Sequence, residues 1–251
     1  MSLRERITEW LALLRSVRIY HGSKKHRQAM DAMYSKFLKP GDLAFDIGAH
    51  VGDRIGSFRR CGARVVALEP QPGPAKVARW FHRRDPEVKI FEMAAADQKG
   101  ELTLRINSRN PTVSSASTEF IAAAQDALAW QGQVWDREIK VPTTTINALI
   151  AEHGQPAFIK IDVEGFEDIV LEGLGWPIPA ISFEFTTIGR DVAQRCLDRV
   201  TILGYSRFNV SLGESHIMVF KKPVDLARMS AWLATVPEKA NSGDIYAILN
   251  A

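Results

Sequence analysis

Apolar residues recur along this chain with two different spacings, and their alternation predicts the order of its elements. Residues 43–45 and 65–68 are short apolar runs of the kind found in strands buried on both faces. Residues 54–61 between them have helical spacing, so we expect a parallel strand–helix–strand unit. Further strands are expected at 88–93, 157–162, 180–185, 205–210 and 244–249, with helices between them. The pattern indicates an α/β protein with seven core strands in a doubly wound sheet.

Several segments add to this core. Residues 4–20 and 25–37 have apolar positions three and four residues apart, which predicts two amphipathic helices. They form an N-terminal helical extension or lid over residues 1–38, ahead of a main domain over residues 39–251. A strand at 101–106, a polar loop, a helix at 118–130 and a strand at 138–142 form an insertion at about residues 101–142. Residues 216–220 are expected to continue the sixth strand as its hairpin partner.

Composition narrows the class of protein. A net charge of +3 is far from the clustered basic excess of a nucleic-acid binder. A basic cluster near residues 15–27 is interpreted either as a solvated face or as a landing site for an anionic substrate or membrane surface. Cys61 and Cys196 lack metal-ligand spacing, so we expect free thiols in a reducing compartment. Charged residues on both sides bracket the apolar stretch at 10–14 too closely for a signal peptide or a membrane span. A cytoplasmic enzyme is expected.

The turn after the first strand carries the main chemical signal. Gly48 and Gly52 allow a tight turn and a close approach of the backbone to a ligand. The dinucleotide pattern G-x-G-x-x-G fails, because His50 and Asp53 stand where it needs glycine. This failure argues against a nicotinamide-dependent oxidoreductase. Glu69, at the end of the second strand, can accept hydrogen bonds from both hydroxyls of a ribose. The turn therefore predicts a nucleoside ligand without a diphosphate.

Two motifs carry a resemblance to a known family. LKPGD at 38–42, FDIGAHVG at 45–52 and ALEP at 67–70 look like the opening of an S-adenosylmethionine-dependent methyltransferase. IKIDVEGFE at 159–167 is similar to the signature of the FkbM branch, and it follows in the expected order. The resemblance implies a Rossmann-like class I methyltransferase fold, with a mostly parallel seven-stranded sheet, an antiparallel final strand and helices on both faces. It also implies S-adenosylmethionine as cofactor.

The resemblance assigns a set of cofactor-binding residues. Small residues after the third strand leave room for a flat base, and an acid beside them can accept a hydrogen bond from an exocyclic amine. The alternative interpretation of the same residues is a strand end followed by a turn. Ser114 and Ser115 resemble a serine pair that approaches the cofactor in the family. The candidates are Asp46, Gly48, Ala49, His50, Gly52, Glu69, Pro70, Ala95, Ala96, Asp97, Ser115 and Asp162.

The catalytic candidates lie at strand ends. Lys160 and Asp162 alternate onto one face of the fourth core strand, where buried charges must either pair or meet a ligand. An internal ion pair is one interpretation, and a place for Asp162 beside the transferable methyl group is the other. Glu164, Glu184 and His216 are further candidates for a base. No ligand pattern is specific enough to assign a metal.

The predicted function follows from the resemblance. FkbM members imply O-methylation of a hydroxyl on a sugar, a glycoside or a secondary metabolite. The expected partners are a small-molecule or glycan acceptor and, as an open possibility, a second copy of the chain, with no nucleic acid and no integral membrane segment. The alternative left open is a non-catalytic partner protein that binds the cofactor or a glycan.

Overall fold

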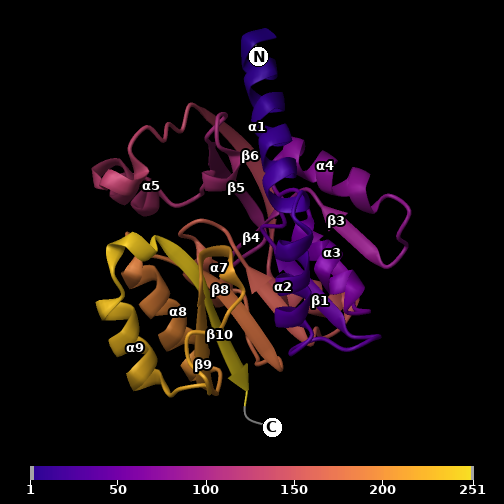
Figure 1. The fold of residues 1–251 in the computed structure, drawn as a ribbon. Coiled ribbons are helices and arrows are strands. Elements are labelled where there is room, and N and C mark those ends of the chain that lie inside the picture. Colours follow the sequence, from indigo (N-terminus) through magenta and orange to yellow (C-terminus); the bar gives the residue numbers. More distant parts are fainter. Residues whose placement is uncertain (1–2, 250–251) are drawn as a thin grey trace.

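The computed structural model describes residues 3–249, and in this range seven strands form one main sheet (Figure 1). Their order is β3-β2-β1-β7-β8-β10-β9. The first five run parallel to one another: β1 (Leu43–Ile47), β2 (Arg64–Leu68), β3 (Val88–Phe91), β7 (Phe158–Ile161) and β8 (Ala180–Thr186). β10 (Ser242–Leu249) is antiparallel to both of its neighbours, β8 and β9 (Tyr205–Leu212). The predicted mostly parallel, Rossmann-like sheet with an antiparallel final strand is confirmed.

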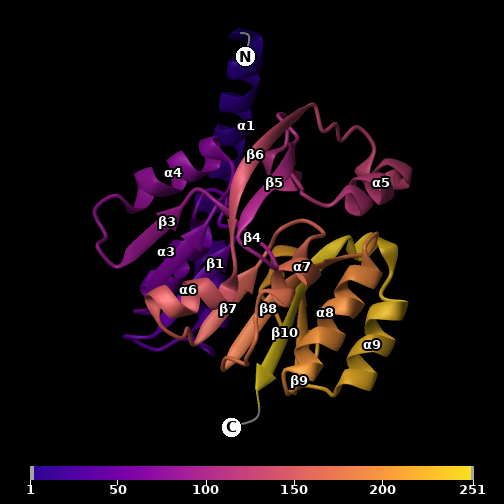
Figure 2. The same ribbon diagram turned by 180° about the vertical axis from the view of Figure 1, so that it is seen from behind.

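Helices cover both faces of the main sheet, as predicted. Figure 1 shows α2 (Lys24–Tyr34) and α3 (Asp53–Arg60) in front of the sheet. Seen from behind, α6 (Ile146–His153), α7 (Glu167–Glu172) and α8 (Arg190–Ile202) lie in front, with α9 (Leu226–Thr235) beside α8 (Figure 2). Successive residues of a strand pack against the helix layers on opposite faces of the sheet. Phe45 and Ile47 pack with α6 to α9, whereas Ala44 packs with α2 and α3.

Two helices lie at the side of the sheet that carries β3. α4 (Pro72–His82) contacts β3, and α1 (Leu3–His21) contacts α4, with Leu13 against Gly73 and the His21 ring stacked on Phe81. Figure 1 shows the N-terminal part of α1 projecting away from the body of the molecule. No helix within residues 3–249 combines the length and the apolarity needed to cross a membrane.

A second sheet lies beyond the carboxyl ends of the parallel strands (Figure 1). Its strand order is β4-β6-β5, with β4 (Ala94–Ala95), β5 (Gly100–Ile106) and β6 (Arg137–Thr144). α5 (Thr118–Asp126) and short 3₁₀ turns at Pro111–Val113 and Leu128–Trp130 belong to the same region. They bury a small core of their own around Phe120 and Trp130. The region has its own small core but also contacts the loops at the carboxyl ends of the main sheet, because Ser115 donates to the backbone oxygen of Glu164.

The predicted hairpin strand at 216–220 is wrong. A 3₁₀ turn at Gly213–Ser215 follows β9, and beyond it a single bridge links Met218 to Ser211. The side chain of Asn209 explains the difference, because its amide nitrogen donates to the carbonyl oxygen of Phe220 at 2.9 Å and its amide oxygen accepts from the Phe220 backbone N–H at 3.1 Å. A side chain therefore replaces part of the backbone ladder that a hairpin would form.

Other predictions of local structure are accurate to within a few residues. The N-terminal helix expected at 25–37 ends at Tyr34, and the helix expected at 118–130 ends at Asp126 before a 3₁₀ turn. Cys61 and Cys196 are free thiols, as predicted. A 3₁₀ turn at Glu238–Ala240 leads into β10.

Candidate functional site

The turn after β1 has the conformation that its glycines allow. Gly48 has a φ of +87°, and a Cβ built on it would lie 1.8 Å from the backbone oxygen of Asp162. The backbone N–H groups of Gly48 and Ala49 both donate to the carbonyl oxygen of Leu68 at 2.9 Å. Only glycine permits this approach of the turn to the segment after β7. The two family-like motifs are therefore in direct backbone contact.

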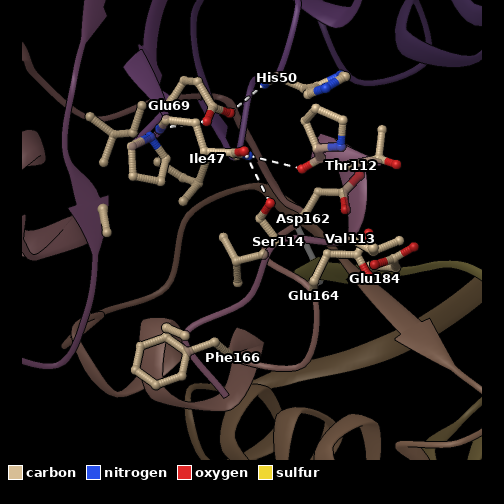
Figure 3. A pocket seen from close by; sticks show the side chains of 18 of the residues that line it. Ile47, His50, Glu69, Thr112, Val113, Ser114, Asp162, Glu164, Phe166 and Glu184 are labelled. Atoms are coloured by element: carbon tan, nitrogen blue, oxygen red, sulfur yellow. Dashed lines mark hydrogen bonds between the residues drawn. The ribbon is translucent and has the colours of Figure 1, made fainter. Parts of the chain in front are cut away.

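A cavity of about 310 Å³ opens at the carboxyl ends of β1, β2, β7 and β8 (Figure 3). One side is formed by the turn after β1, and the opposite side by Leu102, Leu104 and the 3₁₀ turn at Pro111–Val113 of the second sheet region. Eight of the residues predicted from the sequence line this cavity: Gly48, His50, Glu69, Pro70, Ala95, Asp162, Glu164 and Glu184.

The other predicted residues lie away from the cavity surface. Asp46 and Ala49 are buried, and Gly52 lies against Ala78 of α4. Ala96 is buried, whereas Asp97 is exposed on the turn before β5. Ser115 donates a hydrogen bond to the backbone oxygen of Glu164 at 2.6 Å, so it supports a lining residue from behind. His216 is only 6% exposed and does not belong to the lining.

Sequence reasoning missed several lining residues. They are Tyr20, Arg54, Gln71, Glu214 and Asp244, whereas Ser114 belongs to the serine pair that the resemblance had named. Gln71 stands directly beside Pro70, so its position in the sequence was an available signal. Tyr20 and Asp244 reach the cavity from α1 and β10, and no local pattern marks them.

Glu69 is held in one orientation by backbone donors (Figure 3). One carboxylate oxygen accepts from the His50 N–H and the other from the Gln71 N–H, both at 2.8 Å. The side chain of Gln71 in turn donates to the carbonyl oxygen of Pro111 at 3.0 Å and accepts from the Ser114 hydroxyl at 3.0 Å. Burial raises the pKa of Glu69 to about 7. Each oxygen keeps a lone pair that can accept a further hydrogen bond from a ligand hydroxyl.

Lys160 is at the centre of an internal ion network. Its side chain is fully buried, and Nζ lies 2.7 Å from Asp244 Oδ1 and 3.2 Å from Asp162 Oδ2. The internal ion pair that the sequence left open is therefore present. Arg54 extends the network, because Nη2 lies 3.4 Å from Asp162 Oδ2 and 3.0 Å from Glu214 Oε1. Burial alone would raise the pKa of Asp162, but the cations of Lys160 and Arg54 lower it, so Asp162 stays ionised.

Glu164 and Glu184 face the same part of the cavity as Asp162 (Figure 3). Carboxylate oxygens of the three residues lie within 4.8 Å of one another. One oxygen of Glu164 and one of Glu184 is buried with no hydrogen-bond partner in the described part of the chain. Burial, followed by the charge of Asp162, raises the pKa of Glu164 well above its usual range. Burial, with Glu164 and Asp162, does the same for Glu184. The three carboxyl groups therefore hold protons with unequal strength, Asp162 least tightly.

Asp46 lies beneath the glycine turn with an unusual environment. It is 0% exposed, and neither carboxylate oxygen has a hydrogen-bond partner among residues 3–249. Burial raises its pKa to about 7. Because no hydrogen-bond donor among the described residues stabilises the charged form, burial dominates the pKa of Asp46.

Comparison with known proteins adds an independent result. The model of the methyltransferase FkbM domain matches residues 46–208. A search of curated proteins gave no match. Among solved structures, a TehB-like SAM-dependent methyltransferase from Corynebacterium glutamicum is similar, with 11% identity, 98% of this chain and 99% of that chain covered, and a TM-score of 0.49.

Two further structures were also found. The precorrin-6y C5,15-methyltransferase from Geobacter metallireducens has 13% identity over 89% of this chain and 87% of that chain, with a TM-score of 0.43. Fibrillarin from Aeropyrum pernix, in complex with natively bound S-adenosyl-L-methionine, has 11% identity over 84% of this chain and 68% of that chain, with a TM-score of 0.45.

Proposed function

Because the chain belongs to the FkbM methyltransferase family, we propose that it transfers the methyl group of S-adenosylmethionine to a hydroxyl oxygen. The family and the cofactor predicted from the sequence are thereby confirmed. The proposed acceptor is a sugar, a glycoside or a hydroxylated secondary metabolite, either as a small molecule or as part of a glycan.

The residues at the cavity fit this cofactor. The fixed carboxylate of Glu69 is suited to two ribose hydroxyls, and the apolar side chains of Leu68, Met93 and Ala95 are suited to a flat base. Asp162 supplies an ionised carboxylate near the turn, which suits a ligand that carries positive charge. We propose that the nucleoside binds between Glu69 and β4, and that the amino acid part lies toward the turn after β1.

The bound cofactor supplies an electrophilic methyl group on a sulfonium. When a hydroxyl oxygen takes this methyl group, the carbon–sulfur bond breaks, a carbon–oxygen bond forms, and the acceptor loses one proton. The chain must therefore orient the acceptor oxygen and receive the proton. Holding the two reactants in line can lower such a barrier by roughly 7–11 kcal/mol.

The observation that carries the proposal is the carboxyl pair of Glu164 and Glu184 beside the ionised Asp162. Asp162 is stabilised as an anion by two cations, which makes it a weak base. Glu164 and Glu184 hold protons more tightly, so whichever of them is ionised is the better acceptor of a hydroxyl proton. We propose that this pair takes the proton and that Asp162 orients the reacting groups. His216 has no part in this scheme.

The test is a turnover assay with the purified chain, S-adenosylmethionine and a panel of glycosides and hydroxylated metabolites. We expect S-adenosylhomocysteine to form together with an acceptor that has gained one methyl group on oxygen, as located by mass spectrometry and NMR. Methylation of carbon or nitrogen would contradict the proposed acceptor class. Binding of S-adenosylhomocysteine without turnover of any acceptor would favour the non-catalytic partner protein.

Two variants locate the chemistry. Glu184→Gln is expected to lower turnover by about 10²–10⁴-fold, the range typical of a positioned base. Asp162→Asn is expected to lower turnover far more than it lowers the free energy of unfolding. The exposed Asp198→Asn on α8 is the matched control. Normal turnover in either site variant would remove that residue from the mechanism.

Two further parts of the proposal concern the surroundings of the site. We propose that the N-terminal helices act as a wall or lid on the acceptor side, since Tyr20 of α1 lines the cavity and Glu9 forms an ion pair with Arg137 of β6 at 3.3 Å. We also propose that the protein acts in the cytoplasm, since Cys61 and Cys196 are free thiols.

A further inference from the structure

Two histidines that the proposed reaction does not use meet beside Glu214, a residue of the cavity lining. His26 belongs to α2, and His216 follows the 3₁₀ turn after β9. Their ring centroids are 4.9 Å apart. Glu214, from the same turn as His216, completes a group of three in which one donor atom from each side chain lies within 4.8 Å of the other two. His216 Nε2 and Glu214 Oε2 are 3.5 Å apart.

The two imidazoles have nitrogen atoms without hydrogen bonds. Nε2 of His26 and Nε2 of His216 are both buried, and neither has a hydrogen-bond partner anywhere in residues 3–249. The His216 side chain is only 2% exposed, so surrounding water does not compensate it. Buried polar atoms are normally hydrogen-bonded, and two unpaired imidazole nitrogens grouped with one carboxylate are suited to a shared ligand.

The backbone holds His216 in this place. Its φ of +52° is in the left-handed region, which non-glycine residues rarely adopt. The conformation directs the ring toward α2, where it also lies near Tyr34, with ring centroids 6.4 Å apart. Local strain of this kind persists where the surrounding structure enforces it, and it is concentrated at functional sites.

The charges around the group favour a cation. Asp53 and Glu214 bring two carboxylates, and Arg54 is the cation that contacts both, at 3.9 Å and 3.0 Å. Asp53 Oδ2 lies 3.9 Å from His26 Nε2, which is too long for a hydrogen bond. A dication would therefore meet two imidazoles and two carboxylates, with one guanidinium beside them.

We propose that His26, Glu214 and His216 form a binding site for a transition-metal dication, and the ligand types favour zinc. Two imidazole nitrogens and one carboxylate oxygen suit zinc, whereas magnesium and calcium prefer oxygen ligands alone. Zinc is usually four-coordinate, and the remaining position would be taken by water or by Asp53. Bound zinc would join α2 of the N-terminal extension to the turn that carries Glu214 into the cavity lining.

The test is equilibrium dialysis of the full chain against zinc after treatment with a chelator, with metal content measured by mass spectrometry. We expect one zinc per chain. His26→Gln and His216→Gln are each expected to weaken binding by at least about 100-fold, beyond the 10–100-fold typical of an outer-shell residue. Cobalt bound in place of zinc should show the visible absorption of a four-coordinate site in the wild type and should lose it in both variants.

The chain offers a matched control. His153 Nε2 of α6 lies 3.5 Å from Glu152 Oε1, the same distance as in the His216–Glu214 pair. The described residues show no metal-binding group around it, so His153→Gln should leave zinc binding unchanged. Zinc should also raise the unfolding temperature of the wild type and of this control, because binding to the folded state alone is stabilising.

Two further variants keep the test valid if His216→Gln does not fold. The side chains of His26 and Glu214 are 15% and 44% exposed, so His26→Gln and Glu214→Gln change less of the interior. Both should abolish the rise in unfolding temperature with zinc. Failure of the wild type to bind zinc stoichiometrically would overturn the proposal, as would equal binding in every variant. Equal binding would place the metal at another group, such as Asp162, Glu164 and Glu184.

Discussion

The two faces of the main sheet come from the same strands and have opposite chemistry. The face toward α6 to α9 is apolar along its length, with Phe45, Ile159 and Phe183 among its buried residues. The face toward α2 and α3 has apolar residues such as Phe158, but it also buries Asp46, Lys160, Ser182 and Asp244. Because neighbouring residues in a strand point to opposite faces, one step along β7 separates an apolar core from an ion network.

The difference indicates that one face of the sheet contributes stability alone, whereas the other also contributes to the chemistry of the cavity. The apolar face needs no specific partner, since burial of hydrocarbon is favourable wherever the side chains pack. The charged face is tolerated because Lys160 contacts Asp162 and Asp244, and because the network ends at the cavity. We therefore expect changes on the apolar face to alter stability alone, and changes on the charged face to alter ligand binding or pH dependence as well.

The largest expected effect comes from removing the cation at the centre of the charged face. Lys160→Met leaves the carboxylates of Asp162 and Asp244 without their buried partner, so the free energy of unfolding should fall by about 3–5 kcal/mol. Chemical denaturation measures it. Adding Asp244→Asn to the same variant should recover part of the loss, because one unpaired charge is removed. No recovery would contradict the pairing seen between Lys160 and Asp244.

The next effect is a dependence of stability on pH that Asp46 causes. Burial raises the pKa of Asp46 to about 7, so the folded state binds a proton that the unfolded state releases at lower pH. The stabilising contribution is present below about pH 4 and is lost as pH rises through about 7, by up to about 4 kcal/mol. Denaturation of the wild type and Asp46→Asn across this range should show a flatter dependence in the variant.

Two comparisons sharpen this pH experiment. Glu69 and Glu167, whose pKa values burial also raises to about 7, should leave a residual dependence of the same sign in Asp46→Asn. The exposed Asp198→Asn should behave as the wild type. A wild-type stability that rises between about pH 4 and pH 7 would show that other carboxyl groups outweigh these buried ones.

A smaller effect is expected for the cofactor. Glu69→Ala removes an acceptor fixed by two backbone N–H groups, so the affinity for S-adenosylhomocysteine should fall by about 1.5–3 kcal/mol. Isothermal titration calorimetry measures this change. The control is Glu92→Ala, which removes an exposed carboxylate paired with Arg79 at 3.0 Å. An unchanged dissociation constant in Glu69→Ala would place the ribose elsewhere.

The smallest expected effect tests the apolar face. Ile159→Val removes one buried methyl group from β7, directly beside Lys160 in the chain, and should cost about 0.5–1.5 kcal/mol of stability. The affinity for S-adenosylhomocysteine should stay the same. A clear change in affinity would mean that the two faces of the strand are coupled through the backbone.

Most of the fold could be predicted from local pattern. The strands of the main sheet are short apolar runs separated by helices, so β1, β2, β7 and β8 could be recognised in the sequence. The failure at residues 216–220 has a specific cause, because Asn209 supplies hydrogen bonds that backbone pairing would otherwise make. When side-chain hydrogen bonds replace backbone pairing in this way, the amino-acid sequence carries no periodic pattern that would reveal it.

The candidate site was predictable only where it follows strand ends. Glu69, Asp162 and Glu184 each end or follow a parallel strand, and such ends meet at one edge of a sheet. Arg54 and Asp244 join them through tertiary contacts, which a local pattern does not encode. The serine pair shows that a motif does not predict which of two neighbouring residues contacts a ligand. Ser114 lines the cavity, while Ser115 is turned toward the backbone of Glu164.

The place of β10 has a consequence for how the protein is made. A ribosome completes β8 and β9 before it reaches β10, yet β10 lies between them in the sheet. Until Ser242–Leu249 emerges, both earlier strands expose an unpaired edge, and Lys160 lacks its shortest carboxylate contact. A nascent or truncated chain that stops before Ser242 should therefore be a client of chaperones and proteases rather than a partly active enzyme.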